Sequence, residues 1–283
     1  MFVFIKEAVE VMPPFTHLAV RFAAAALVMA VWAFASAGAG FVSKSLLRDG
    51  VILGVWLFLG FASQTYGVHM TSVANAGFIT GFNIVLVPLL GMWVWKTKPG
   101  KPALLGIAVA VVGIALLTLG GAEPPNLGDF LVLICAFAFS VHILLTGAYT
   151  SRHHPVALAF VQIAAVSVCN AVAAFFFEDW KPALSPEVLG SFPVVRAILI
   201  GALFATAFAY WAQTYFQRFT TPVRTALIFA SEPVFAAASG MILAGEVLTV
   251  QAVAGSLLIL GGILISELRG SGGSTQNDKV NAA

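Results

Sequence analysis

Long apolar runs, separated by short polar segments, follow one another along nearly the whole chain. Each run is about 20 residues long, which is the length that an α-helix needs to cross the hydrocarbon core of a bilayer. Prolines stand at many of the boundaries, as expected where helices begin or end. The pattern predicts an all-α polytopic membrane protein with spans at residues 15–37, 51–70, 73–95, 101–120, 127–149, 155–177, 194–217, 222–244 and 248–267.

One part of this pattern occurs twice. Residues 64–113 align with residues 213–262 without a gap, at an offset of 149 residues (213 − 64). The recurring identities are Gln64-Thr65-Tyr66 with Gln213-Thr214-Tyr215, Gly91-Met92 with Gly240-Met241, Gly106 with Gly255, and Gly113 with Gly262. Duplication of an apolar chain is typical of transporters, in which two related halves surround a site near the membrane midplane.

The duplication predicts two five-helix repeats, at residues 1–122 and 127–269. Residues 270–283 are rich in Gly, Ser and Asn, which predicts a disordered cytoplasmic tail. In the second repeat a complete helix precedes Pro155. Pro14 has the same place in the first repeat, so only the end of the first helix precedes it here. We therefore expect a ten-helix pattern whose first helix is incomplete. The alternative is a nine-helix protein with a short amphipathic lead.

Positive charges are distributed unevenly between the two sets of loops that this pattern defines. One set receives ten Lys and Arg residues, and the other receives only Lys6, Lys181 and Arg196. Because cytoplasmic loops are enriched in Lys and Arg, we expect the first set, and both termini, to be cytoplasmic in the inner (plasma) membrane. Five helices per repeat then give the halves opposite orientations, which makes the duplication an inverted repeat.

Composition agrees with a bilayer environment. Hydrophobic residues make up 60% of the chain and charged residues 9%, whereas a soluble domain carries about 25% charged residues. The formal net charge of +2 is too small to indicate nucleic-acid binding.

The sequence lacks the usual signatures of catalysis. It contains no P-loop, no paired carboxylates and no HExxH-type cluster. Both cysteines, Cys135 and Cys169, lie inside apolar spans, which disfavours a disulfide or a metal site. We therefore expect no cofactor, no metal and no enzymatic activity.

Glu232 is the most informative polar residue inside a predicted span. A carboxylate in hydrocarbon needs a partner or a water-filled cavity, so Glu232 is expected to take up a proton, bind a substrate amine or pair with a cation; the alternative is that it only pins helices together. Asn83 is its equivalent in the first repeat. The adjacent Pro233, and Pro88 near Asn83, are expected to act as hinges, since interrupted helices at matching places indicate a transporter site.

Other polar side chains accompany these two. Gln64 and Tyr66 recur on the eighth helix as Gln213 and Tyr215, preceded by Tyr210; they either contact substrate or form interhelical hydrogen bonds. His142 is expected to shuttle a proton or bind substrate; the alternative is a satisfied core histidine.

Two further features lie outside the predicted cavity. Arg21, near the outer start of its span, either snorkels to headgroups or attracts anions. The glycine-rich fifth and tenth helices are expected to form a packing or homodimer platform.

Several of these residues occur in a characteristic order: Pro13-Pro14 with Arg21-Phe22, Glu232-Pro233, Ala244-Gly245-Glu246, and Gly255 with Gly261-Gly262. In this order and spacing the chain resembles the EamA-type permeases of the drug/metabolite transporter superfamily over nearly all of residues 4–268. The resemblance implies ten helices in two inverted five-helix repeats, a cavity lined by the third, fourth, eighth and ninth helices, and transport of small metabolites, often export of amino acids. The chain departs from the family in its incomplete first helix.

The sequence predicts a secondary transporter that works by alternating access, and the family resemblance implies export of amino acids or related metabolites. The expected substrate-binding residues are Gln64, Tyr66, Asn83, His142, Tyr210, Gln213 and Glu232. Proton coupling through Glu232 and facilitated diffusion fit equally well. The competing hypotheses are a non-transporting assembly or sensor subunit and a membrane-embedded lipid-handling enzyme.

Overall fold

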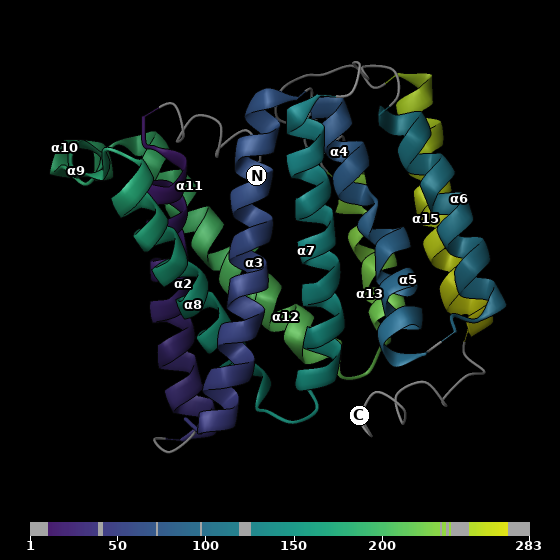
Figure 1. Cartoon of the computed structure of the whole chain (residues 1–283), viewed down its shortest axis with the longest axis horizontal. Helices are drawn as coiled ribbons and strands as arrows, with labels where there is room; N and C mark the ends of the chain where they lie inside the picture. Colours follow the sequence, from purple (N-terminus) through teal and green to yellow (C-terminus); the bar gives the residue numbers. More distant parts are fainter. Residues whose placement is uncertain are drawn as a thin grey trace. The chain divides into compact units, whose positions relative to one another are not determined.

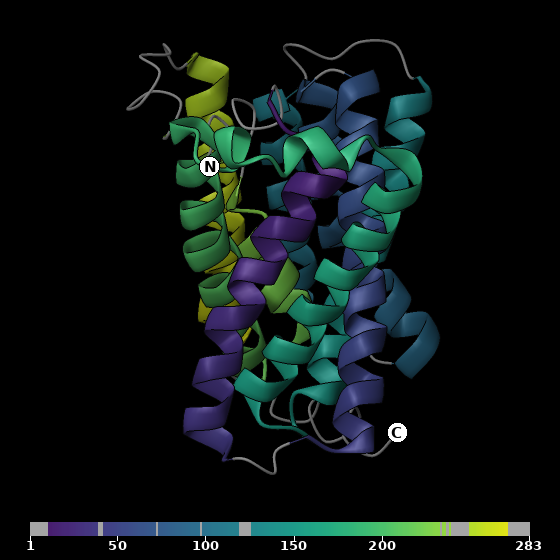
Figure 2. The ribbon, with the colours of Figure 1, turned by 90° about the vertical axis from the view of Figure 1, so that its left-hand side faces the viewer.

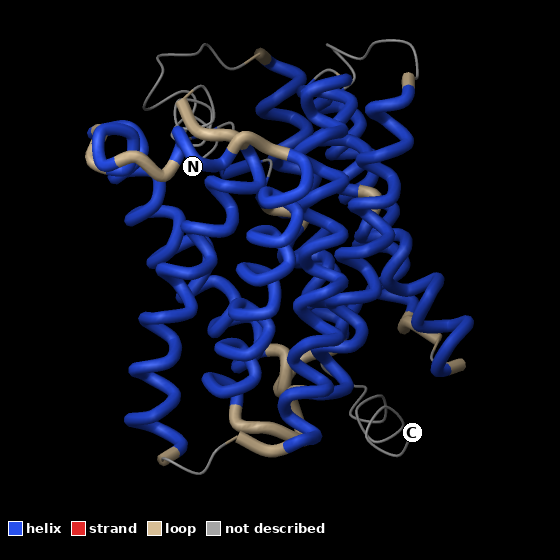
Figure 3. Tube along the Cα trace, turned by 60° about the vertical axis from the view of Figure 1, so that its left-hand side comes forward, coloured by secondary structure: helices blue, strands red, loops and turns tan. Residues whose placement is uncertain are grey.

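The computed structural model describes residues 11–38, 42–71, 73–96, 98–118, 126–232, 234–235, 238 and 249–270. Within these ranges every element is a helix (Figure 3). Six helical segments are long and apolar enough to cross a membrane: Pro14–Ala37, Lys44–Val68, Asn75–Val94, Leu127–Tyr149, Pro155–Phe177 and Phe192–Phe216. Two shorter apolar helices lie at Lys101–Leu116 and Val250–Ser266. The prediction of an all-α polytopic membrane protein is confirmed.

The chain forms two compact units. Unit 1 consists of Met1–Phe58 and Tyr149–Arg218, and unit 2 consists of Leu59–Ala148 and Phe219–Ala283. Helix α3 (Lys44–Met70) contributes its first part to unit 1 and its second part to unit 2. Each unit therefore combines chain from both of the predicted repeats.

Unit 1 is built around α2 (Pro14–Ala37) and α8 (Pro155–Phe177), which lie side by side (Figure 2). Both helices have proline in the first turn, where its fixed φ favours helix initiation and its missing N–H is not needed. The hydroxyl of Ser167 donates to the Ala19 carbonyl at 3.0 Å, and Glu178, directly after α8, binds the first turn of α2. The two helices are therefore antiparallel.

The start of α2 has an unusual cap. The Glu178 carboxylate accepts hydrogen bonds from the Phe15 N–H at 2.7 Å, the Thr16 N–H at 2.8 Å and the Thr16 hydroxyl at 2.8 Å. The first N–H groups of a helix have no partner within the helix and carry its positive dipole end, so a carboxylate is a favourable cap. This contact ties the end of α8 to the start of α2.

The rest of unit 1 comes from the segment after α8. Two short helices, α9 (Trp180–Ala183) and α10 (Pro186–Leu189), lead to α11 (Phe192–Ala202), η2 (Leu203–Phe208) and α12 (Ala209–Phe216). The predicted span 194–217 is thus not a uniform α-helix, because η2 is a π-helical segment in its middle. A π segment shifts the hydrogen bonds by one residue, widens the helix and is frequent at functional sites.

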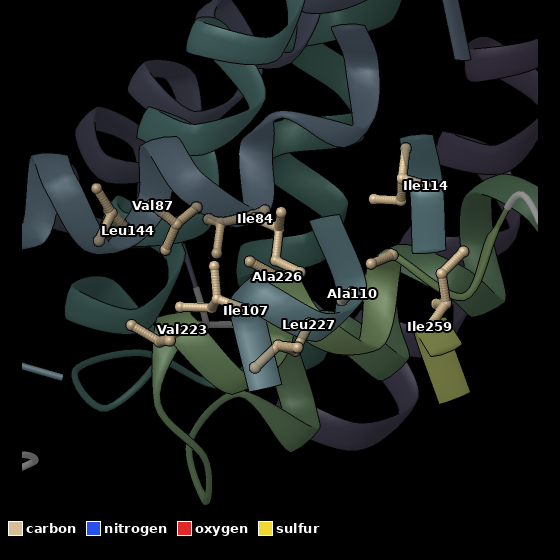
Figure 4. Packing of buried hydrophobic residues seen from close by; sticks show 12 residues of the cluster. Ile84, Val87, Ile107, Ala110, Ile114, Leu144, Val223, Ala226, Leu227 and Ile259 are labelled. Carbon is tan, nitrogen blue, oxygen red and sulfur yellow. The ribbon is translucent and has the colours of Figure 1, made fainter. Parts of the chain in front are cut away.

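Unit 2 contains α4 (Val73–Gly81), α5 (Asn83–Trp95), α6 (Lys101–Thr118), α7 (Leu127–Tyr149), α13 (Pro222–Phe229) and α15 (Val250–Gly270). Figure 4 shows its core, a cluster that contains Ile84 and Val87 of α5 together with side chains of α6, α7, α13 and α15. The predicted span 73–95 is interrupted at Phe82, which separates α4 from α5. Of the predicted span 222–244, α13 occupies the first turns, and residues 239–248 lie outside the described residues.

Helices α6 and α15 lie side by side over their length (Figure 1). A Cβ atom built on Gly106 would lie 2.5 Å from the Gly262 carbonyl oxygen, and one on Gly113 would lie 2.7 Å from that of Gly255. Position numbers thus fall along α15 as they rise along α6, so the helices are antiparallel. Only glycine permits this backbone contact, and the glycine-rich spans therefore pack on each other within the chain.

Candidate functional site

A buried guanidinium lies in the middle of unit 1. Arg21 is 4% exposed, and its Nε donates to the hydroxyl of Thr206 at 2.9 Å. Its Nη2 makes a longer bond, 3.4 Å, to the Ala205 carbonyl oxygen. Both acceptors belong to η2, so the wide π-helical segment meets α2 at this arginine. The snorkelling alternative for Arg21 is wrong, because the side chain turns to η2 within the unit.

Two more polar side chains are buried in unit 1 with atoms that have no hydrogen-bond partner. His17, one turn before Arg21 on α2, is 1% exposed, and neither ring nitrogen has a partner. Asn170 of α8 is fully buried; its Nδ2 donates to the Val166 carbonyl, but its Oδ1 is unpaired. Buried polar atoms without partners are rare and costly. We therefore expect a further hydrogen-bonding group, such as one on a ligand, at this place.

A second polar chain in unit 1 joins α8 to α12. The amide of Gln162 donates to the hydroxyl of Thr214 at 3.1 Å, and that hydroxyl donates to the Tyr210 carbonyl at 2.7 Å. The hydroxyl of Thr150 donates to the carbonyl of Thr214. These bonds satisfy polar groups that would be expensive in hydrocarbon, and they fix the segment that follows η2.

The sequence-predicted residues of unit 1 lie on this segment. Gln213 is 9% exposed, and its amide bonds Gln217 one turn later at 3.4 Å. Tyr210 is half-buried on the turn after Thr206. Tyr215 is 36% exposed and stacks on Trp211, with ring centroids 5.7 Å apart. Gln213 therefore faces the protein, while Tyr215 belongs to an aromatic surface.

The remaining sequence-predicted residues belong to unit 2. Asn83 begins α5, directly after the break at Phe82; it is 8% exposed, and its Oδ1 has no hydrogen-bond partner. Pro88 lies inside α5, six residues beyond that break. Glu232 follows α13 with an exposed side chain, and Pro233 lies outside the described residues. The hinge roles of the two prolines stay predictions.

Gln64, Tyr66 and His142 also lie in unit 2. Gln64 is half-buried on α3, and Tyr66 is 41% exposed, so this pair is arranged like Gln213 and Tyr215 in unit 1. His142 on α7 is 2% exposed, and its Nε2 lies 3.4 Å from the Thr146 hydroxyl. This contact fits the satisfied core histidine that the sequence left as one alternative.

Sequence reasoning missed a carboxylate network at the start of α7. Asp129 is 9% exposed and accepts from the Thr71 hydroxyl, from the Asn75 amide at 3.2 Å and from the Asn126 N–H at 2.9 Å. A cavity of about 330 Å³ adjoins this network. It is lined by Phe78, Ile79, Phe82, Asn126, Asp129, Phe130 and Leu133. Its lining is mostly apolar, and the Asp129 carboxylate is already well satisfied by its partners.

A second missed contact joins α3 to the α7–α8 loop in unit 1. Asp49 is 1% exposed, and its carboxylate lies 2.8 Å from His153 Nε2 and 2.9 Å from Arg48 Nη2. The adjacent pair His153-His154 gave no hint of this partner, which is 104 residues away. Within the described parts of the chain, no group of three His, Cys, Asp or Glu side chains is arranged to hold a metal ion.

Comparison with known proteins agrees with this architecture. The EamA-like transporter family matches the chain twice, over residues 1–119 and 126–268. An uncharacterized transporter of Archaeoglobus fulgidus is 32% identical over 265 residues, which cover 94% of this chain and 80% of that protein. The uncharacterized transporter YetK of Bacillus subtilis is 26% identical, covering 93% and 81%. A solved crystal structure with 16% identity superposes with a TM-score of 0.78 over 94% of this chain and 91% of that one.

Proposed function

The chain belongs to the EamA-like transporter family, and from this premise we propose that it exports amino acids or related small organic metabolites across the inner (plasma) membrane. That it is a multi-pass membrane transporter follows from the family and from its apolar helices. The substrate, the direction and the mechanism are the proposal.

The proposed mechanism is alternating access by two inverted repeats, at residues 1–122 and 127–269, with both termini cytoplasmic. The separate family matches over the two halves support the repeats. The antiparallel pairs α2 with α8 and α6 with α15 support their inversion, because each pair joins helices at equivalent places in the two repeats. Inverted repeats of this kind permit a site to open to either side in turn.

Polar side chains inside the spanning helices are the observation that supports a polar substrate. Such groups cost free energy in hydrocarbon and usually mark a substrate or ion pathway. Asn83 keeps an unpaired, buried acceptor, and Gln213 is buried on a helix that carries a π segment. The proposed substrate-binding set is Gln64, Tyr66, Asn83, His142, Tyr210, Gln213 and Glu232.

Efflux from proteoliposomes tests this function. Vesicles with purified protein are loaded with a pool of labelled amino acids and small metabolites, and efflux is followed with and without a pH gradient. We expect efflux of a defined compound, slowed on the order of tenfold or more in Glu232→Gln and Gln213→Ala, because each change removes a polar contact worth about 1.5 kcal/mol or more. Glu187→Gln, an exposed glutamate in the short α10, is the matched control.

The pH gradient separates the two coupling modes. Efflux that a proton gradient drives in wild type, but not in Glu232→Gln, supports proton coupling through Glu232. Efflux that ignores the gradient supports facilitated diffusion. Well-folded wild-type protein that moves no compound in the pool would reject metabolite export and favour a non-transporting assembly or sensor subunit.

A further inference from the structure

Arg21 is a buried cation to which the described part of the chain offers no carboxylate. Two acidic residues of unit 1 are engaged elsewhere: Glu178 caps the first turn of α2, and Asp49 binds Arg48 and His153. Arg21 instead donates to a hydroxyl and a carbonyl oxygen, both neutral. A buried guanidinium without an anion costs free energy in a bilayer. We therefore expect this charge to have a functional role.

The guanidinium also has N–H donors that these two hydrogen bonds do not use. It carries five N–H groups, and hydrogen bonds to Thr206 and Ala205 use two of them. The Nε edge is turned to η2 by the bond to Thr206. The remaining N–H groups are in the fork geometry that binds a carboxylate with two parallel hydrogen bonds.

Unpaired polar atoms of two other side chains lie at the same level of unit 1. His17 precedes Arg21 by one helical turn, so both side chains lie on one face of α2, and both ring nitrogens of His17 are unpaired. The bond from Ser167 to Ala19 sets the antiparallel register of α8 on α2 and brings Asn170 level with the turn that holds His17. The unpaired Asn170 Oδ1 is thus a third buried group.

The depth of this cluster suits a small solute inside the membrane. With a rise of about 1.5 Å per residue, His17 and Arg21 lie roughly 5 and 10 Å from the start of α2. The hydrocarbon core is about 30 Å thick, and the 24 residues of α2 span about 36 Å, so both side chains fall within the hydrocarbon when the helix is centred in the bilayer. Lipid headgroups are therefore not the natural partner of this arginine.

Charge balance identifies the group that fits. A carboxylate carries one negative charge and neutralises one guanidinium, while an imidazole N–H supplies a further hydrogen bond. A phosphate monoester carries about −1.5 to −2 at neutral pH and would leave excess negative charge beside a single cation. The cluster therefore matches a monocarboxylate.

We propose that Arg21 and His17, with Asn170 of the neighbouring helix α8, form a carboxylate-binding site in unit 1 that takes the carboxylate of the transported metabolite. This inference rests on the proposed transport of small organic metabolites and names the substrate class as carboxylates. Thr206 and Ala205 orient the guanidinium, and the π-helical segment presents their oxygens to it.

Ligand-induced thermal stabilisation tests the site without transport. Purified full-length protein is heated with each proteinogenic amino acid and with short-chain monocarboxylates, and every acid is paired with the amide in which a neutral carboxamide group replaces the carboxylate. We expect acids to stabilise the wild type and their amides to fail. Arg21→Gln should weaken acid binding on the order of 10- to 100-fold, because a charge-assisted hydrogen-bond pair is lost. Arg21→Lys should retain part of the affinity.

Two control variants separate binding from folding. Arg218→Gln removes an exposed arginine of the same unit and should leave acid binding unchanged. Thr206→Val removes the hydroxyl that Arg21 bonds but keeps the guanidinium. If Arg21 serves only as a clamp on η2, then Thr206→Val should resemble Arg21→Gln in every readout. If Arg21 binds carboxylate, Thr206→Val should lose stability but keep the preference for acid over amide.

Several outcomes overturn the site. Wild-type protein that no acid in the panel stabilises, or that acids and amides stabilise equally, would refute it. A preference for acids that persists in Arg21→Gln would refute the role of Arg21. If only amines or neutral compounds bind and are exported, the carboxylate site fails while transport of metabolites stands; if acids bind but no efflux occurs, the site stands and transport fails.

Discussion

The contact between α6 and α15 should be sensitive to a single methyl group. Gly106 and Gly262 face each other so closely that a Cβ on either would lie 2.5 Å from the carbonyl oxygen of the other. Gly261, the neighbour of Gly262, is in open space, with no atom within 4 Å of a Cβ built there. Gly106→Ala and Gly261→Ala therefore make the same chemical change in two opposite environments.

The magnitude follows from this geometry. An ordinary contact begins at 3.4 Å, so the 2.5 Å approach requires a local separation of roughly 0.9 Å (3.4 − 2.5). A gap of this size forfeits about a quarter to a half of each contact energy along the seam, and overpacking of this kind costs about 1–3 kcal/mol. Both variants also gain up to about 1 kcal/mol of helix propensity. That gain cancels in the comparison, which leaves about 1–3 kcal/mol between them.

The chain supplies its own probe of unfolding. Cys135 is a free, fully buried cysteine, and Cys169 is a free cysteine that is half-buried. In a Cys169→Ser background, a thiol-reactive fluorescent dye therefore reports the exposure of Cys135 as detergent-purified protein is heated. At roughly 2 °C per kcal/mol for a chain of this size, Gly106→Ala should melt about 2–6 °C below Gly261→Ala. Gly262→Ala should behave like Gly106→Ala, and the double variant should cost less than the two changes added, because both open the same gap.

Equal melting temperatures for Gly106→Ala and Gly261→Ala would refute the close backbone contact. Additive costs in the double variant would also contradict it, since two changes that open one shared gap cannot act independently. A loss of stability in Gly261→Ala alone would place the packed face of α15 on the opposite side.

Three polar contacts give further predictions in the same thermal assay. Glu178→Ala should cost about 1–2 kcal/mol, because the start of α2 loses its cap, and Glu178→Gln should recover part of this; equal loss in both would reject the cap. Asp129→Ala should cost about 2–3 kcal/mol, since three donors lose a charged acceptor, and an unchanged midpoint would reject that network. His153→Phe should cost about 1–3 kcal/mol by removing a partner of buried Asp49, whereas exposed His154→Phe should stay within about 0.5 kcal/mol; similar effects of both would contradict the contact between His153 and Asp49.

Hydropathy was enough to predict where the helices lie, but not where they begin. The span predicted from residue 51 starts at Lys44, because the first two turns of α3 carry Lys44, Arg48 and Asp49. These charges look like loop in a hydropathy pattern. In the structure Asp49 is buried against His153 from another part of the chain, and a partner that distant leaves no local signal.

The sequence pattern also did not predict the interruptions inside the spans. The break at Phe82 and the π segment Leu203–Phe208 both lie in apolar stretches. Apolarity reports the surrounding solvent and is indifferent to the register of backbone hydrogen bonds. The nearest signal was Pro88, which marked the correct helix but lies six residues beyond the break.

The residues of the candidate site could also be predicted only in part. Polar residues such as Glu232, Asn83 and Gln213 stand out in an apolar sequence, so each could be identified as a candidate. Their partners could not be, since Arg21 and Thr206 are 185 residues apart in the chain. His17 could have been identified from the sequence, because it lies four residues before Arg21 and therefore on the same face of the helix.

The equivalent positions of the two repeats differ in charge in a consistent way. In the predicted repeats, Arg21 corresponds to Gln162 by the offset of 141 residues that aligns Pro14 with Pro155, and Glu232 corresponds to Asn83 by the offset of 149 residues. In each pair one repeat keeps a charge and the other an amide, which is the cheaper polar group in a bilayer. The amide of Gln162 has found a partner in Thr214, whereas Arg21 has found only neutral oxygens. If the fold alone required the charge, we would expect it in both repeats or in neither. The asymmetry therefore favours a ligand that breaks the symmetry of the repeats, and a metabolite with an acidic end does so.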